Sequence, residues 1–168
     1  RQMCIRDSID TSFYRQAAAL LARHAQHGSS VLDYGCGLGY FLQAVKEEGY
    51  QPYGVEFDHA AAAAAAAAVG CPVYTVSELQ HRRDANLFDV LHLGDVLEHL
   101  PDPGLTLAGL LQLLKPGGLL FVEGPLEANP SPVYWCSRLF GNLKHCLHPS
   151  LIGPGVPAHL FRTSAKAQ

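Results

Sequence analysis

Long apolar runs and an excess of positive charge are both missing from this chain of 168 residues. No apolar run approaches the roughly 18 residues that a membrane-spanning helix needs, so we expect no membrane span. Lys and Arg number 12 against 15 Asp and Glu, which gives a net charge of −3, and the cations are scattered. A nucleic acid is therefore not expected as the substrate, because the sequence supplies no basic field for a polyanion.

Cysteine is scarce and shows no pairing pattern. The five cysteines are an odd number without a C-x-x-C pair, and no apolar signal segment opens the chain. We therefore expect a reducing, cytoplasmic environment rather than a disulfide framework. Cys136, His145, Cys146 and His148 combine metal-binding side chains in a short span, but adjacent His145 and Cys146 cannot easily both face one metal. We predict no metal site.

The most informative segment that is present is a glycine-rich turn, Tyr34-Gly35-Cys36-Gly37-Leu38-Gly39. Apolar residues precede it and an amphipathic run follows it, which predicts a strand, a tight turn and a helix. Backbone N–H groups in such a turn are free to meet a ligand. The segment therefore implies a nucleoside cofactor.

Charge and glycine spacing indicate which nucleoside binds there. A dinucleotide would place its pyrophosphate over the turn, where the carboxylate of Asp33 would repel it by roughly 1 kcal/mol at 4 Å in water and about 4 kcal/mol at an effective dielectric of 20. The dinucleotide fingerprint also needs its third glycine where this chain has Tyr40. S-adenosylmethionine (SAM) carries an ammonium and a sulfonium and no phosphate. The turn therefore favours SAM.

A second acid, Glu56, ends the apolar run Tyr53-Gly54-Val55 that predicts the next strand. A carboxylate at the carboxyl end of a strand can accept hydrogen bonds from both ribose hydroxyls. Nicotinamide sites use an acid at similar spacing, so Glu56 alone does not discriminate between cofactors.

Four motifs in this order resemble class I SAM-dependent methyltransferases, and most of all their ubiquinone-biosynthesis-like small-molecule branch. They are DYGCGLG at 33–39, the strand ending in Glu56, FDVL at 88–91 leading into DVLEHLPDP at 95–103, and LKPGG at 114–118. The resemblance covers roughly residues 30–125. The superfamily is well specified by these motifs, and the substrate branch is specified more loosely.

The resemblance implies a Rossmann-like α/β fold with a doubly wound, mostly parallel sheet, SAM as the cofactor, and a small-molecule acceptor methylated on oxygen in preference to nitrogen or carbon. With the chemistry of the turn, it assigns SAM contacts to Asp33, Gly35, Cys36, Gly37, Gly39, Tyr40, Glu56, Phe57, Ser77, Glu78, Leu79, Gly94, Asp95 and Val96. Contacts from Ser77, Glu78 and Leu79 would be to adenine, although the commonest family pattern has an Asp near this point.

Two histidines are candidates for the general base. His99 comes first, because the resemblance puts it at the acceptor end of the fourth strand and histidine titrates near neutral pH. His159 comes next, since its motif is expected to close over the site. In many relatives the histidine at the position of His99 is structural. Glu98 beside it is expected to flank the acceptor, and the alternative for Glu98 is a structural carboxylate at the start of a helix.

Periodicity and turn residues predict alternating strands and helices. The expected strands are 30–34, 52–57, 73–76, 88–93 (interrupted by Asp89 and His92) and 119–122. The expected helices are a first one from a cap at residues 10–12 to Gly28, then 38–48, 60–68, a start at 96–100 and 105–114. This order implies a parallel, doubly wound sheet.

Three helices carry more specific expectations. The first is expected to pack on the sheet through residues that include Phe13 and Leu20, and the last through residues that include Leu105. The alanine tract 60–68 favours a helix by composition but has no amphipathic pattern, so its register is weakly fixed. Asp58 is its expected N-cap.

The expected domain organisation has three parts. Residues 1–8 show no periodicity and are set aside as an extraneous scar. Residues 9–125 form the SAM-binding domain, and residues 126–168 form a cap over the acceptor pocket at a truncated end of the same domain. More than half of the prolines lie after Glu123 and strand signals there are poor, so we expect the C-terminal strands of the family to be lacking.

Three functions from different classes remain open. The first is a SAM-dependent methyltransferase acting on a small molecule. The second is a truncated or degenerate domain that holds SAM, or only its product, without turnover. The third is a nicotinamide-dependent oxidoreductase, against which Asp33 and Tyr40 argue. The sequence identifies neither the acceptor nor the oligomeric state.

Overall fold

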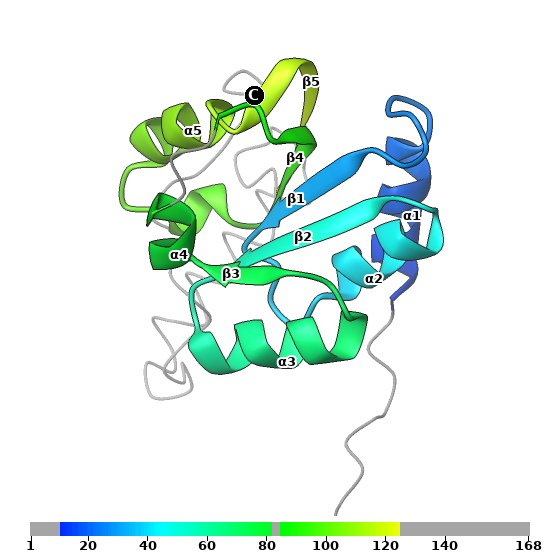
Figure 1. Cartoon of the computed structure of the whole chain (residues 1–168), viewed down its shortest axis with the longest axis horizontal. Coiled ribbons are helices and arrows are strands. Elements are labelled where there is room, and N and C mark those ends of the chain that lie inside the picture. The colour runs from blue at the N-terminus through cyan, green and yellow to red at the C-terminus, as the bar shows by residue number, and fades with distance from the viewer. Residues whose placement is uncertain (1–10, 82–84, 125–168) are drawn as a thin grey trace, which may run out of the picture. The chain divides into compact units, whose positions relative to one another are not determined.

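The computed structural model describes residues 11–81 and 85–124 (Figure 1). The chain divides into two compact units, Arg1–Gly94 with Gly104–Glu123 and Asp95–Pro103 with Gly124–Gln168. The described part of the second unit is 95–103 and residue 124. The first unit contains the whole sheet.

Five parallel strands form this sheet, in the order β3-β2-β1-β4-β5. The strands are β1 Ser30–Tyr34, β2 Gln51–Glu56, β3 Val73–Thr75, β4 Phe88–Gly94 and β5 Leu114–Glu123. The α-helices are α1 Ser12–Leu21, α2 Tyr40–Glu47, α3 His59–Val69, α4 Val76–His81 and α5 Pro103–Leu111. This is the Rossmann-like, doubly wound α/β fold that the sequence predicts.

Helices cover both faces of the sheet, and this explains why its central strands are largely apolar. In Figure 1, α1 and α2 lie on one side of the sheet and α4 and α5 on the other. All residues of β1 are buried, because a parallel strand between two helical layers has no solvated side. The core on the side of α1 and α2 consists of Ala17, Ala18, Leu21, Val31, Phe41, Ala44, Val45, Tyr50 and Val90.

The alanine helix α3 forms where the sequence predicts it. A carboxylate oxygen of Asp58 accepts a hydrogen bond from the Ala61 N–H at 2.8 Å, which satisfies one of the free donors of the first helical turn. Ala62 and Ala65 are buried against the rest of the first unit. The cap and these two small side chains fix the register that the composition leaves weakly specified.

Replacing Asp58 by Ala should therefore lower the free energy of unfolding by about 1 kcal/mol, because the helix loses its N-terminal acceptor. In a chain of this size that corresponds to a fall in melting temperature of about 2–4 °C. Thermal unfolding followed by circular dichroism measures it. Asp58→Asn is the matched control, since Asn keeps the acceptor and should melt within about 1 °C of the wild type.

The outer helices differ from the sequence prediction. Helix α1 ends at Leu21 rather than near Gly28, and Phe13 and Leu20 are 54% and 43% exposed. The expectation is wrong for these two side chains, whereas Ala17 and Leu21 of the same predicted face are buried together with Ala18. Leu105 of α5 is 73% exposed, so the expectation is wrong for this side chain, whereas Leu110 of the same helix is buried.

Two further elements, α4 and the segment at 115–118, differ from the sequence prediction. The short helix α4 follows β3 directly, and its six residues are too few for periodicity to reveal. The LKPGG segment lies within β5: Phe88 pairs with Leu114 and Val90 with Leu119, so residues 115–118 form an irregularity in the strand. The predicted scar, cap and missing C-terminal strands concern residues outside the described ranges. In the described part of the chain, no helix has both the length and the apolar character needed to cross a bilayer.

Candidate functional site

The glycine-rich turn joins β1 to α2 and is tied to the neighbouring strand β2. The N–H groups of Gly35 and Cys36 both donate to the Val55 carbonyl, at 2.8 and 3.0 Å. Gly39 precedes α2 with a φ of 83°, and a Cβ there would lie 2.9 Å from a methyl carbon of Val69. The turn therefore packs so closely on α3 that this position requires glycine.

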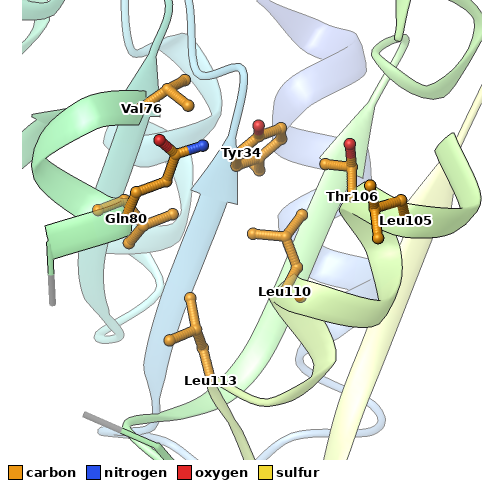
Figure 2. A pocket seen from close by; sticks show the side chains of 9 residues that line it. Tyr34, Val76, Gln80, Leu105, Thr106, Leu110 and Leu113 are labelled. Atoms are coloured by element: carbon orange, nitrogen blue, oxygen red, sulfur yellow. The ribbon is translucent and has the colours of Figure 1, made fainter. Parts of the chain in front are cut away.

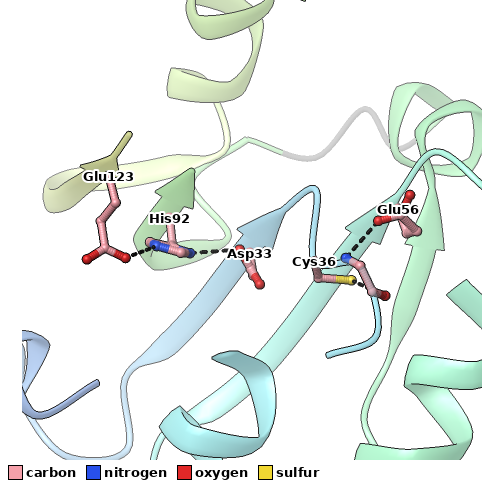
Figure 3. Close-up of polar contacts among 6 residues, drawn as sticks. Asp33, Cys36, Glu56, His92 and Glu123 are labelled. Carbon is pink, nitrogen blue, oxygen red and sulfur yellow. Dashed lines mark hydrogen bonds and ion pairs between the residues drawn. The ribbon is translucent and has the colours of Figure 1, made fainter. Parts of the chain in front are cut away.

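Glu56 lies beside this turn at the carboxyl end of β2 (Figure 3). Its Oε2 accepts a hydrogen bond from the Gly37 N–H at 2.7 Å. Its Oε1 accepts from the N–H groups of Phe57 at 2.7 Å and Asp58 at 3.1 Å. Backbone donors thus hold the carboxylate at the sheet edge where ligands of open α/β sheets bind.

Asp33, at the end of β1, takes part in a cluster of charged side chains that crosses three strands (Figure 3). His92 of β4 pairs in register with Asp33. Its Nδ1 lies 2.7 Å from Asp33 Oδ1, and its Nε2 lies 3.1 Å from Glu123 Oε2 on β5. Asp33 and His92 are each only 3% exposed. We refer to Asp33, His92 and Glu123 as the carboxylate–histidine cluster.

The environment of His92 favours the imidazolium form. Burial lowers the pKa of His92, but the charges of Asp33 and Glu123 and their hydrogen bonds outweigh burial and raise the pKa to about 9. Both ring nitrogens face carboxylate oxygens, which only accept hydrogen bonds when ionised, so both nitrogens act as donors. Phe41 stacks on the ring with centroids 3.8 Å apart, and this fixes the plane of the imidazole.

The stability of the protein should therefore depend on pH through His92. A raised folded-state pKa means that the contribution is complete below the unfolded value of about 6.5 and is lost as the pH rises to about 9. The full effect is about 3 kcal/mol, from a shift between these two values. Urea unfolding at pH 6, 8 and 9.5 measures it. In His92→Asn this pH-dependent part should be missing, and an equal slope in both proteins would contradict the assignment.

His92 and Glu123 add two charges of opposite sign beside Asp33. Asp33 is not an isolated carboxylate, because the imidazolium of His92 balances its charge. The two carboxylates and the imidazolium of the cluster together carry one net negative charge, the same as Asp33 alone, so the preference for a cation over a diphosphate is retained. His92 and Glu123 were missed as site residues. The signal was available, because His92 interrupts an apolar strand that pairs with the strand of Asp33.

Other residues of the predicted cofactor site lie around the same turn. Cys36 is buried, and burial, with a smaller effect of the Asp33 and Glu56 charges, raises the pKa of its thiol to about 12. Tyr40 stacks on Tyr14 of α1 with ring centroids 5.7 Å apart. A buried thiol with such a high pKa is protonated at neutral pH, so Cys36 acts through packing and its backbone.

Two further predicted residues have defined surroundings at the sheet edge. Phe57 is half-exposed and contacts the ring of Tyr34 edge-on, at 5.5 Å between centroids. A Cβ at Gly94 would lie 2.9 Å from the ring of His92. Gly94 therefore leaves room for the imidazole, and this role was not foreseen from the sequence.

The predicted adenine contacts fall on α4. Glu78 Oε2 accepts hydrogen bonds from the N–H and hydroxyl of Thr75, at 2.7 and 2.9 Å, and the Ser77 hydroxyl lies 3.0 Å from the same hydroxyl. These bonds cap α4, so both polar side chains are engaged locally. Leu79 is buried and lines a cavity of about 370 Å³ between α4 and α5, together with Tyr34 and Leu110 (Figure 2).

The remaining predicted residues belong to the second unit. Asp95 has a left-handed φ of 51°. A 3₁₀ helix, Leu97–His99, follows it, and the His99 N–H donates to the Val96 carbonyl at 3.0 Å. Glu98 is buried, and its Oε1 has no hydrogen-bond partner in the described residues. His159 lies outside the described ranges. The residues that the structure describes contain no cluster of three or more His, Cys, Asp or Glu side chains suited to a metal.

Comparison with known proteins identifies the family. Residues 8–150 match the model of a methyltransferase domain. The chain is 31% identical to the ubiquinone biosynthesis O-methyltransferase of Pseudomonas paraeruginosa over 110 residues, which are 61% of this chain and 47% of that protein. The chain therefore belongs to the methyltransferase domain family, and SAM is its cofactor. It spans about half the length of the curated relatives it matches.

Solved structures agree on the fold. One neighbour is a structure described as a sarcosine dimethylglycine methyltransferase from Galdieria sulphuraria, with a TM-score of 0.63 and 18% identity over 79% of this chain and 54% of that one. Another is the YcgJ protein of Bacillus subtilis, with a TM-score of 0.61 and 18% identity over 90% of this chain and 63% of that one. At these identities the likeness concerns the fold alone.

The residues at the turn fit SAM. Two carboxylates, Asp33 and Glu56, lie at the ends of adjacent strands, which suits a ligand with an ammonium and two ribose hydroxyls. Of the two carboxylate oxygens of Asp33, Oδ1 is the one that forms a hydrogen bond within the described residues, to His92. Its second oxygen can therefore accept from the ammonium. No Lys or Arg occurs at 33–41 to pair with a diphosphate. The donor set thus matches a cationic nucleoside.

Proposed function

We propose that this domain binds SAM over the glycine-rich turn and serves to methylate an oxygen atom of a small molecule. The observation that carries the proposal is the hydrogen bond from the Gly37 N–H to the Glu56 carboxylate, beside the turn that follows Asp33. The O-methylation rests on the curated relatives, which are named ubiquinone biosynthesis O-methyltransferases. The chain spans about half of their length, so we take from them the class of acceptor and not a particular compound. That class is a small phenolic compound.

The proposed roles of the residues follow from charge and hydrogen bonding. Glu56 accepts from the ribose hydroxyls, and the second oxygen of Asp33 accepts from the ammonium. When bound, SAM supplies an activated methyl group with a neutral thioether as leaving group. The remaining task of the protein is to align the acceptor oxygen, exclude water and accept the hydroxyl proton. Gly35, Gly37 and Gly39 allow the close approach of the backbone to the cofactor.

His99 is the proposed general base, with His159 as the second candidate. The imidazole of a histidine can accept the proton of a phenol as its oxygen attacks the methyl carbon. Asp95 and Val96 precede His99 and are proposed to contact the methionine end of the cofactor. The contacts from Ser77, Glu78 and Leu79 to adenine remain proposals of the same kind, with Leu79 supported by its place in the wall of the cavity.

A methyl-transfer assay with a panel of phenols and catechols tests this function. The expected result is transfer of labelled methyl from SAM to at least one hydroxyl. His99→Gln should reduce the turnover by about 10²–10⁴-fold, in the range for removal of a general base. His81→Gln, on the exposed end of α4, is the control and should leave the turnover unchanged. Tight SAM binding without transfer to any acceptor would favour the alternative of a binding module.

A further inference from the structure

We propose that His92 is a positioning residue of the SAM site: held between Asp33 and Glu123, its imidazolium keeps the buried Asp33 carboxylate as an anion in the orientation that receives the ammonium of SAM. This inference rests on the proposed function, since it assigns a role at the same site. Neither His92 nor Glu123 belongs to the residues that the motifs assign to the cofactor.

The carboxylate of Asp33 is buried. A carboxylate that is 3% exposed loses its hydration and remains ionised only if a cation and hydrogen-bond donors replace the water. His92 is the cation that contacts it, at 2.7 Å from Nδ1 to Oδ1. A strand neighbour in register supplies it, so the pair does not depend on a flexible side chain.

Glu123 supports His92 from the side opposite Asp33. A buried imidazolium between a single carboxylate and apolar rings would be poorly compensated, and Glu123 on β5 supplies the second acceptor at 3.1 Å. Phe41 of α2 and Phe121 of β5 are the ring contacts of the imidazole. In the described part of the chain, the charged groups that contact His92 are Asp33 and Glu123, and they come from the strands on either side.

The cluster needs space for the imidazole and access to the ligand-binding edge. Gly94 leaves the space that the ring of His92 occupies, since a Cβ there would lie 2.9 Å from it. Glu123 side-chain exposure is 20%, so the outer carboxylate reaches solvent at the ligand-binding edge. A protein that needed only a folded sheet at this point would be served by apolar side chains of the same volume. The cluster instead delivers an oriented carboxylate beside the glycine-rich turn.

Matched substitutions separate the two contacts of His92. The amide nitrogen of Asn occupies the position of Nδ1, and that of Gln the position of Nε2. His92→Asn thus keeps a donor toward Asp33, whereas His92→Gln keeps only the donor toward Glu123. By calorimetric titration with SAM at pH 7.5, we expect His92→Gln to bind at least tenfold more weakly than the wild type and His92→Asn only a few-fold more weakly.

A third variant adds a pH signature that a purely structural role would not produce. Glu123→Gln removes the outer charge and keeps the shape. Its affinity for SAM relative to the wild type should be equal at pH 6, where His92 is protonated, and several-fold weaker at pH 8.5. The ratio to the wild type at each pH cancels the titration of the amino group of SAM. Glu47→Gln, a carboxylate on the exposed end of α2, is the control and should show a ratio of one at both pH values.

Nuclear magnetic resonance gives a readout that does not need ligand affinity. In protein labelled with ¹⁵N-histidine, the resonances absent from the His92→Asn spectrum belong to His92. They should show two protonated ring nitrogens at pH 7.5, and a neutral ring there would overturn the inference. Unchanged SAM affinity in His92→Gln, with only a lower melting temperature, would overturn it as well. Failure of the wild type to bind SAM would instead overturn the proposed function and the inference together.

Discussion

Replacing Asp33 by Asn is expected to weaken the binding of SAM by roughly a hundredfold. Truncating one partner of a buried, hydrogen-bonded charge pair costs about 2–5 kcal/mol, and here the loss falls on both the ammonium of SAM and the imidazolium of His92. Asn keeps the size of the side chain, so the effect reports charge rather than packing. Calorimetric titration with SAM measures it, on protein shown by circular dichroism to be folded.

Asp89→Asn is the matched control for that substitution. Asp89 is the acid of β4, the strand that pairs with that of Asp33, and Lys115 and Ser30 hold it at the opposite edge of the sheet. The same change of charge there should alter stability and leave the affinity for SAM within about twofold of the wild type. Equal losses of affinity in the two variants would contradict the assignment of Asp33, because they would indicate a general effect of charge or folding.

Replacing Gly39 by Ala should be the most destabilising single-methyl change in the turn. A φ of 83° costs a residue with a side chain about 1–2 kcal/mol. The added Cβ would also lie 2.9 Å from a methyl of Val69 and 3.3 Å from the Cβ of Ala65, and overpacking of this kind costs about 1–3 kcal/mol. We expect a fall in melting temperature of about 5–15 °C, with a loss of SAM affinity because the turn must shift.

Gly109→Ala is the control for that experiment. Gly109 lies within α5, and a Cβ there meets no atom within 4 Å. The substitution should stabilise the protein by about 0.5–1 kcal/mol, because Ala favours helix over Gly. Differential scanning calorimetry of the two variants gives both values. A stable Gly39→Ala protein with normal SAM affinity would show that the turn does not pack on α3 as described.

The elements that could be predicted from the sequence are those specified by local signals. β1 was predicted with its observed bounds, and α3 was predicted from its alanines and from Asp58, whose cap is observed. The site residues Asp33 and Glu56 were placed at strand ends because the glycine spacing and the apolar runs fix those ends within a few residues.

The features that could not be predicted depend on partners far away in the sequence. The cluster joins positions 33, 92 and 123, and its geometry depends on the register of three strands, one of which contains the irregularity at 115–118. The local role of Glu78 also competes with its predicted adenine contact, because the carboxylate accepts from Thr75 in the cap of α4. Helix exposure was misjudged for Phe13 and Leu105, since spacing alone does not tell which face a neighbour covers.

We identify the turn at 35–39, with Asp33 and Glu56, as a site for a cationic nucleoside. Calorimetric titration of the wild-type chain with SAM and, in parallel, with NAD at the same ionic strength tests it most directly. We expect a saturable heat with SAM at one site per chain and none with NAD. Saturable binding of NAD together with no binding of SAM would contradict it.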